Sequence, residues 1–199
     1  MAVRIWEIDP THSTIEFSTK HMMFTTVRGR FTRFHGRLHL DREAPDSSWA
    51  EVYIETASLD TGVPDRDGHL RSADFFDAEN HPEIVFRSKE TFGAQPEEGA
   101  RFRVVGDLQI ADTTEEVTLD VLFQGRGVDP WGKERVGFQA TCEIDRRDWG
   151  LKWNQALETG GVLVANKVRI EADVQAVLAE ETVGQEAGGQ AAGSQAAGG

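Results

Sequence analysis

The sequence is poor in positive charge, with 21 Lys and Arg residues against 34 Asp and Glu residues and a formal net charge of −13. A nucleic-acid-binding surface needs a basic patch that neutralises phosphates and releases their counterions. We therefore expect no nucleic-acid partner. The only cysteine is Cys142, which excludes an intramolecular disulfide and any metal or iron–sulfur site built from several cysteines. We expect its thiol to be a small buried hydrophobic group.

Long apolar runs are also missing. No segment approaches the roughly 18 consecutive apolar residues of a membrane span, and Arg4, Glu7 and Asp9 interrupt the apolar centre that a signal peptide would have. These absences predict a cytoplasmic protein with no stable membrane insertion. Apolar side chains are scarce after Ala179, and such a composition does not offset the entropy of ordering a chain. We expect one domain over residues 1–178 and a disordered Gly/Ala/Gln tail over residues 179–199.

Helical periodicity is almost absent, whereas a period of two is frequent and places alternate side chains on opposite faces of a strand. Between positions 162 and 174 the even positions are mostly apolar, and the odd ones include Lys167, Arg169 and Glu171. The same alternation recurs along the chain and predicts about eight strands. Their inward-facing residues fall within 15–17, 34–40, 52–56, 84–88, 104–110, 117–123, 138–144 and 162–174.

The segments between these runs predict how the strands connect. Most resemble hairpin turns, as in 95–99 and 125–132, so consecutive strands are expected to pair antiparallel. A sheet with one apolar face and no large helix to cover it must bury that face against itself. We predict an all-β fold, an extended eight-stranded antiparallel barrel with a short helical excursion near residues 65–76.

The predicted strands at 28–40, 101–112 and 162–174 are long and would enclose a deep interior. Small eight-stranded barrels are either packed by side chains or hold one small ligand, and the mixture of large and small inward residues leaves both arrangements open. We expect Trp149 and Trp153 to plug one end. The apolar residues expected to line an open bore are Phe17, Phe34, Phe86, Leu108, Ile110, Phe123, Phe138 and Val168.

A series of short motifs resembles a known family and covers about residues 5–177 in order. The motifs include WEIDPTHS at 6–13, VRGRF at 27–31, SLDTG at 58–62, HLRS at 69–72, DFFD at 74–77, HPEI at 81–84 and DRRDWGL at 145–151. With these motifs the chain resembles the YceI-like family of lipocalin-like, polyisoprenoid-binding barrel proteins.

The resemblance implies a long apolar bore that holds an isoprenoid or another lipid-like chain, without a catalytic step and without a cofactor. A polar head group would need a few donors or charges at the mouth of the bore. The candidates are His12, His21, Arg66, His69 and Arg71, although Arg66 and its neighbours can instead serve only to hold a long connection. We also expect that two copies can pair through apolar rims.

Other functions need features that the sequence offers only weakly. Stress-related sequestration of diverse lipophilic compounds or antibiotics is an alternative that uses the same bore. An enzyme would need a polar cluster with perturbed pKa values inside it. Asp9, His12 and Ser13 are too close in sequence to act as a hydrolytic set and are expected to form a turn. His35 and His39 lie on a polar face and are expected to be solvated rather than metal-bound.

Overall fold

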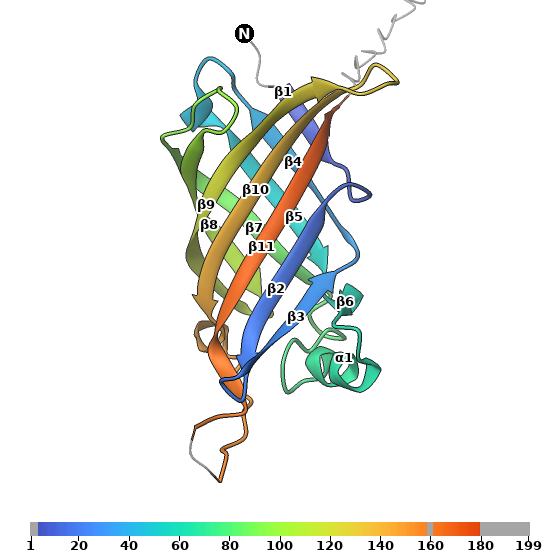
Figure 1. Cartoon of the computed structure of the whole chain (residues 1–199), viewed down its shortest axis with the longest axis vertical. Helices are drawn as coiled ribbons and strands as arrows, with labels where there is room; N and C mark the ends of the chain where they lie inside the picture. The colour runs from blue at the N-terminus through green and yellow to red at the C-terminus, as the bar shows by residue number, and fades with distance from the viewer. Residues whose placement is uncertain (1–3, 159–160, 180–199) are drawn as a thin grey trace, which may run out of the picture.

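The computed structural model describes residues 4–158 and 161–179 (Figure 1). Within these ranges one α-helix, α1 (Pro64–Arg71), accompanies a chain made mostly of strands. Short 3₁₀ helices form at Pro45–Ser47, Thr56–Ser58 and, as η3, at Arg146–Trp149. The strands are β1 (Arg4–Ile8), β2 (Thr14–His21), β3 (Thr25–Phe31), β4 (Phe34–Leu40), β5 (Trp49–Glu55), β6 (Leu59–Asp60), β7 (Glu83–Phe92), β8 (Arg101–Ile110), β9 (Thr113–Val128), β10 (Glu134–Asp145) and β11 (Val164–Leu178).

The strands form a closed antiparallel barrel of eight walls, as predicted. Three walls are composite, because each consists of two strands that follow one another in the chain: β1 with β2, β3 with β4, and β5 with β6. Thus β1 pairs with β4 and β2 pairs with β3. The last strand, β11, pairs with β2 along its first part and with β1 at its end, which closes the barrel.

Cross-strand register explains why alternate residues share the interior. Phe138 lies opposite Val174, Ala140 opposite Ala172 and Cys142 opposite Ile170, so one apolar face continues from β10 to β11. This face belongs to a single apolar core that runs around the inside of the barrel.

Several boundaries differ from the sequence-based expectation. The strand predicted over 28–40 is broken at Thr32–Arg33, and β1 is a strand that the alternation did not indicate. Gly125 and Gly127 belong to β9 rather than to a turn, because Gly125 (φ +122°) adapts to a bulge in the pairing with β10. The turn itself lies at Asp129–Gly132, where Gly132 N–H donates to Asp129 C=O.

Two irregular segments gather at one end of the barrel, at the bottom of Figure 1. One contains α1 and extends to Pro82, which is close to the excursion predicted near residues 65–76. The other begins with η3 and leads to β11. We call this the α1 end; the other end carries the β9–β10 turn. In the part of the chain described, no helix is long and apolar enough to cross a bilayer.

Candidate ligand-binding interior

The eight residues predicted to line a bore all lie on the inner face. Phe34, Phe86, Leu108, Ile110 and Phe123 are buried in the core. Phe17 and Phe138 are half-buried and pack against it. Val168 is half-buried and lies opposite Ile144 on β10 and Thr19 on β2.

Two of the phenylalanine rings lie against the barrel wall at glycines. Phe17 is paired with Gly29 on the next strand, and a Cβ on Gly29 would come within 2.4 Å of the Phe17 ring. A Cβ on Gly106 would likewise come within 2.7 Å of the Phe86 ring and 2.6 Å of the Arg87 carbonyl oxygen. Glycine is therefore required at both positions, because it lets a ring approach the neighbouring backbone.

Contacts between aromatic rings join strands on the same side of the barrel. The Phe123 and Phe138 ring centroids are 5.2 Å apart on the paired strands β9 and β10, and those of Phe17 and Phe31 are 5.6 Å apart on β2 and β3. Phe102 and Phe138 meet at 6.4 Å from the two strands that flank β9. Among the described residues, no ring contact connects opposite walls.

The inner face is not equally buried along its length. Some inward side chains are almost fully covered, whereas a group on β2 and β8–β11 remains half-buried although the register turns it inward. Sequence reasoning omitted Phe102 from the bore, although its position two residues before Val104 places it on the same face. The half-buried inward group consists of the apolar residues Phe17, Phe102, Val104, Leu119, Phe138, Ala140, Ile144, Val168, Ile170, Ala172 and Val174.

Almost fully buried residues lie near both ends of the barrel. Away from α1, Trp6, Val136 and Ala176 retain 2%, 1% and 0% of their accessible surface. At the α1 end, Trp149 is buried and its Nε1–H donates to the Leu108 carbonyl oxygen at 2.9 Å. The predicted plug is thus present at Trp149, where η3 turns the chain back beneath the barrel.

Arg146, also in η3, is a buried cation that the sequence analysis did not single out. Its guanidinium donates to the carbonyl oxygens of Leu151, Trp153 (2.9 Å), Val164 (3.4 Å) and Ala165 (3.1 Å), and to Asn166 Oδ1 (3.4 Å). None of the ion pairs within the described ranges includes it. Burial lowers the pKa of the Arg146 guanidinium, but an arginine remains charged in a protein. Its hydrogen bonds show a structural role in joining η3 to the start of β11.

The candidate head-group residues on α1 make local contacts. Arg66 donates from Nε to Thr61 Oγ1 at 2.7 Å and from Nη2 to the Thr61 carbonyl oxygen at 3.0 Å. Arg71 donates to the carbonyl oxygens of Ala57 (2.9 Å) and Leu59. These bonds attach α1 to the end of the β5–β6 wall.

His69 connects the two irregular segments. Its Nε2 is 2.9 Å from Asp74 Oδ2, and its ring meets Trp153 edge-on at 4.6 Å and Phe75 at 5.2 Å. We call the contact of His69 and Phe75 with Trp153 the seam, since it joins the segment around α1 to the segment after η3. Trp153 therefore contributes to the seam rather than to the buried plug at Trp149.

The two remaining head-group candidates lie apart from one another. His21 ends β2 at the α1 end, opposite Val164. His12 lies in the break between β1 and β2, where its Nδ1 is 2.8 Å from Asp9 Oδ2. The structure thus gathers His21, Arg66, His69 and Arg71 at one end and places His12 on the side of the barrel.

Asp9, His12 and Ser13 form the predicted turn. Asp9 Oδ1 accepts from the Thr11 N–H at 3.0 Å, and Ser13 Oγ donates to the Asp9 carbonyl oxygen at 2.7 Å. Burial would raise the pKa of Asp9, but hydrogen bonds from Arg135, His12 and Thr11 hold it well below its ordinary value. These contacts leave Ser13 bonded to backbone rather than facing a base.

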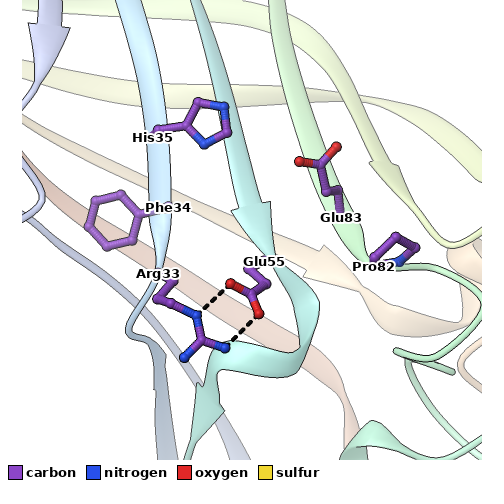
Figure 2. A pocket seen from close by; sticks show the side chains of 6 residues that line it. All are labelled: Arg33, Phe34, His35, Glu55, Pro82 and Glu83. Atoms are coloured by element: carbon purple, nitrogen blue, oxygen red, sulfur yellow. Dashed lines mark hydrogen bonds and ion pairs between the residues drawn. The ribbon is translucent and has the colours of Figure 1, made fainter.

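Among the described residues, shallow hollows lie on the outer surface between β4, β5 and neighbouring strands. One, of about 490 Å³, is lined by Arg33, His35, Glu55 and Glu83 with Phe34 and Pro82. Figure 2 shows that the Phe34 ring points away from His35, and that Arg33 and Glu55 are joined by two hydrogen bonds of 2.5 Å. Another, of about 400 Å³, is lined by Glu7, Ile8, His35, Gly36, Arg37, Glu51 and Tyr53.

His35 and His39 belong to this outer face, as predicted. The His35 ring stacks on Tyr53 with centroids 5.1 Å apart, and the His39 ring stacks on Trp49 at 3.5 Å. Within residues 4–158 and 161–179, no three His, Cys, Asp or Glu side chains are grouped so that they could hold a metal ion.

These observations define a closed eight-stranded antiparallel barrel with an apolar inner face. A family model described as the YceI-like domain matches residues 6–176. The chain belongs to this family, as its motifs predicted.

Relatives and solved structures agree with this assignment. UPF0312 protein SERP2314 of Staphylococcus epidermidis is 39% identical over 171 residues, which are 85% of this chain and 95% of the relative. The crystal structure of Burkholderia cenocepacia BcnA matches with a TM-score of 0.72 at 24% identity, over 84% of this chain and 98% of BcnA. A polyisoprenoid binding domain from Saccharophagus degradans matches with a TM-score of 0.67 at 14% identity, over 89% and 99% of the respective chains. At these identities the two structures show a shared fold.

Proposed function

We propose that the protein binds a polyisoprenoid or a similar long-chain lipophilic molecule inside the barrel, for storage or transport and without a catalytic step. The observation that carries this proposal is the half-buried inward group on β2 and β8–β11. Inward side chains retain accessible surface where the interior is incompletely filled, and an apolar ligand would cover that surface. The name of the Saccharophagus degradans domain, polyisoprenoid binding, supports the same class of ligand.

The physical basis for binding is apolar area. A hydrocarbon chain forms no hydrogen bonds, and it gains about 25 cal/mol for each Å² that it removes from water. Phe17 would offer apolar surface to such a chain, because it remains half-buried while its ring lies against Gly29 of the wall. Ring contacts between neighbouring walls, such as Phe123 with Phe138, would fix this lining without blocking the axis.

We place the head group at the α1 end, near His21, Arg66, His69 and Arg71. Arg66 Nη1 makes none of the hydrogen bonds found within the described residues, whereas Nε and Nη2 both bond to Thr61. Arg71 is engaged with two backbone carbonyls. With so few donors free, a neutral head such as an alcohol or quinone suits this end better than a diphosphate.

The direct test is extraction of the protein purified from its native host into organic solvent, followed by mass spectrometry. We expect one long-chain apolar compound in stoichiometric amount. Protein denatured before purification serves as the control for lipid that adheres nonspecifically. An empty extract together with no uptake of added prenyl lipids would overturn the proposal.

Competition with a fluorescent lipophile separates a dedicated carrier from a general sequestering protein. A dedicated carrier should release the fluorophore to prenyl chains at much lower concentrations than to unrelated lipophiles. Weak displacement by many unrelated compounds would favour sequestration of diverse lipophiles or antibiotics.

A further inference from the structure

The turn between β2 and β3 presents three consecutive apolar side chains to solvent. Met22, Met23 and Phe24 are 39%, 63% and 80% exposed. We call these three residues the apolar tip. Exposed apolar residues that occur singly are ordinary, but a contiguous group at a protruding turn indicates contact with an apolar phase or partner.

The backbone conformation of the apolar tip does not favour methionine at positions 22 and 23. Met22 (φ +49°) and Met23 (φ +63°) both adopt the left-handed conformation, and the Phe24 N–H donates to the His21 carbonyl oxygen at 3.1 Å. Tight hairpin turns of this kind favour Asn and Gly at their two central positions. Methionine is therefore present at a conformational cost, which points to a role for its side chain.

The β2–β3 hairpin that carries the apolar tip is rich in positive charge. From Phe17 to Phe31 the chain contains Lys20, Arg28 and Arg30 but no acidic residue, although the whole protein carries a net charge of −13. Arg30 pairs with Asp60 at 3.3 Å. The described ion pairs include neither Lys20 nor Arg28, and the one side-chain hydrogen bond shown for them joins Lys20 Nζ to Thr26 Oγ1.

Lys20 and Arg28 lie on the outer face of the hairpin. Lys20 is opposite Thr26 and Arg28 is opposite Ser18, so the two cations are diagonal neighbours just above the turn. A small apolar group that can enter the acyl region, with cations placed at head-group level behind it, is the arrangement by which peripheral proteins bind anionic bilayers.

We propose that the apolar tip, with Lys20 and Arg28, docks the protein peripherally on a bilayer that contains anionic lipids. A bilayer fits better than a protein partner because it complements both features of this hairpin. Its apolar layer can accept the apolar tip, and its negatively charged surface can attract Lys20 and Arg28. The choice also rests in part on the proposed function, since a long apolar cargo is dissolved in membranes.

Docking would orient the barrel with its α1 end towards the membrane. The apolar tip lies at that end, where the Met22 N–H donates to the Leu163 carbonyl oxygen at 2.8 Å (Figure 1). The seam between His69, Phe75 and Trp153 lies at the same end of the barrel. A membrane-bound barrel would therefore present to the lipid the end at which the two covering segments meet.

The test is flotation of the full chain with vesicles of phosphatidylcholine containing 30% phosphatidylglycerol, compared with vesicles of phosphatidylcholine alone. We expect binding to the anionic vesicles that weakens with added salt. The double variant Met23→Asn with Phe24→Ser should weaken this binding by about tenfold or more, since it removes the two most exposed apolar side chains. Lys20→Gln and Arg28→Gln should each weaken it by about fivefold.

Two controls keep the result interpretable. Asn suits the left-handed backbone at position 23, so the double variant should fold as well as the parent protein. Trp131→Ser removes a side chain that is 81% exposed in the β9–β10 turn, at the other end of the barrel, and should leave vesicle binding unchanged. Absence of vesicle binding by the parent protein, equal binding by the double variant, or loss of binding in Trp131→Ser would overturn the proposal.

Uptake of farnesol in vesicle-free buffer reports on the proposed function alone. The double variant should bind farnesol like the parent protein. If the parent protein floats with vesicles but takes up no farnesol, the docking proposal is supported and the proposed function is refuted. If it takes up farnesol but does not float with vesicles, the docking proposal is refuted and the proposed function is supported.

Discussion

Arg135 on β10 donates from Nη1 to Asp9 Oδ2 at 2.7 Å and thereby connects the β1–β2 break to the wall on the far side of β11. The same guanidinium donates from Nη1 to Gln175 Oε1 at 2.9 Å and from Nε to Asp129 Oδ2 at 2.8 Å. The Arg135 side chain therefore joins the β1–β2 break, the turn after β9 and the end of β11.

Replacing Asp9 by Asn should destabilise the protein by about 1–3 kcal/mol at neutral pH, because the charged acceptor is lost. The pKa of Asp9 is depressed in the folded state, so its contribution is complete above the ordinary value near about 4 and declines as the pH falls below it. Urea unfolding of both proteins between pH 3 and pH 7 measures this difference. A difference that stays constant down to pH 3 would contradict it.

Adding a methyl group at Gly106 should destabilise the barrel by about 1–3 kcal/mol, since the new Cβ would meet the Arg87 carbonyl oxygen and the Phe86 ring. Gly68→Ala is the matched control. Nothing lies within 4 Å of a Cβ at that position in α1, and Ala favours a helix by up to about 1 kcal/mol over Gly. The urea midpoints of the two variants should move in opposite directions.

Enlarging Phe138 to Trp should weaken binding of long prenyl chains more than that of short ones, because the larger ring narrows the interior beside Phe102 and Phe123. Phe92→Trp makes the same change at an exposed position on β7 and should affect neither. Titration with a series of prenyl alcohols measures the effect. Equal losses for all chain lengths would place the binding site elsewhere.

Cys142 should react very slowly with a thiol reagent in the native protein at pH 8. Burial, aided by the charge of Asp120, raises the pKa of its thiol to about 11. At this pH the thiolate is then about a hundredfold scarcer than that of an ordinary cysteine. Reaction in urea should be fast, and equal rates in both conditions would show that the thiol is accessible.

Replacing Arg146 by Ala should lower the free energy of unfolding by more than about 3 kcal/mol, since it leaves several buried carbonyl groups without donors. The neighbouring Arg147 is 55% exposed and bonds to Asp145, so Arg147→Ala should change stability little. Thermal unfolding of the pair measures the contrast. Similar effects of both substitutions would show that the Arg146 hydrogen bonds contribute little.

The alternation of apolar and polar residues predicted most strands and many of the inward-facing side chains, because the period of two is a property of the extended backbone itself. Phe123 and Phe138 were assigned to the inner face from their own strands, and register brings them opposite one another. The family resemblance was confirmed independently by the match over residues 6–176.

Features that depend on distant contacts could not be predicted in the same way. Alternation alone does not show that Trp6 lies in a strand, because β1 is short and is held by its pairing with β4 and β11. Arg146 and Arg147 are adjacent and chemically identical, and only the turn of η3 decides which one is buried. The roles of the candidate head-group residues stay predictions. The disorder expected for the tail also stays a prediction, because residues 180–199 lie outside the described residues.

The three composite walls give the barrel two unlike halves. The continuous strands β7–β11 are paired along most of their length, whereas the neighbouring walls are interrupted at Asp9–Ser13, at Thr32–Arg33 and at Thr56–Ser58. Local opening begins where backbone pairing is interrupted, so amide hydrogens beside these breaks should exchange sooner than those of β8–β10. If a bound molecule were wider than the interior of the barrel, we would expect the three composite walls to move apart while the continuous strands β7–β11 keep their arrangement.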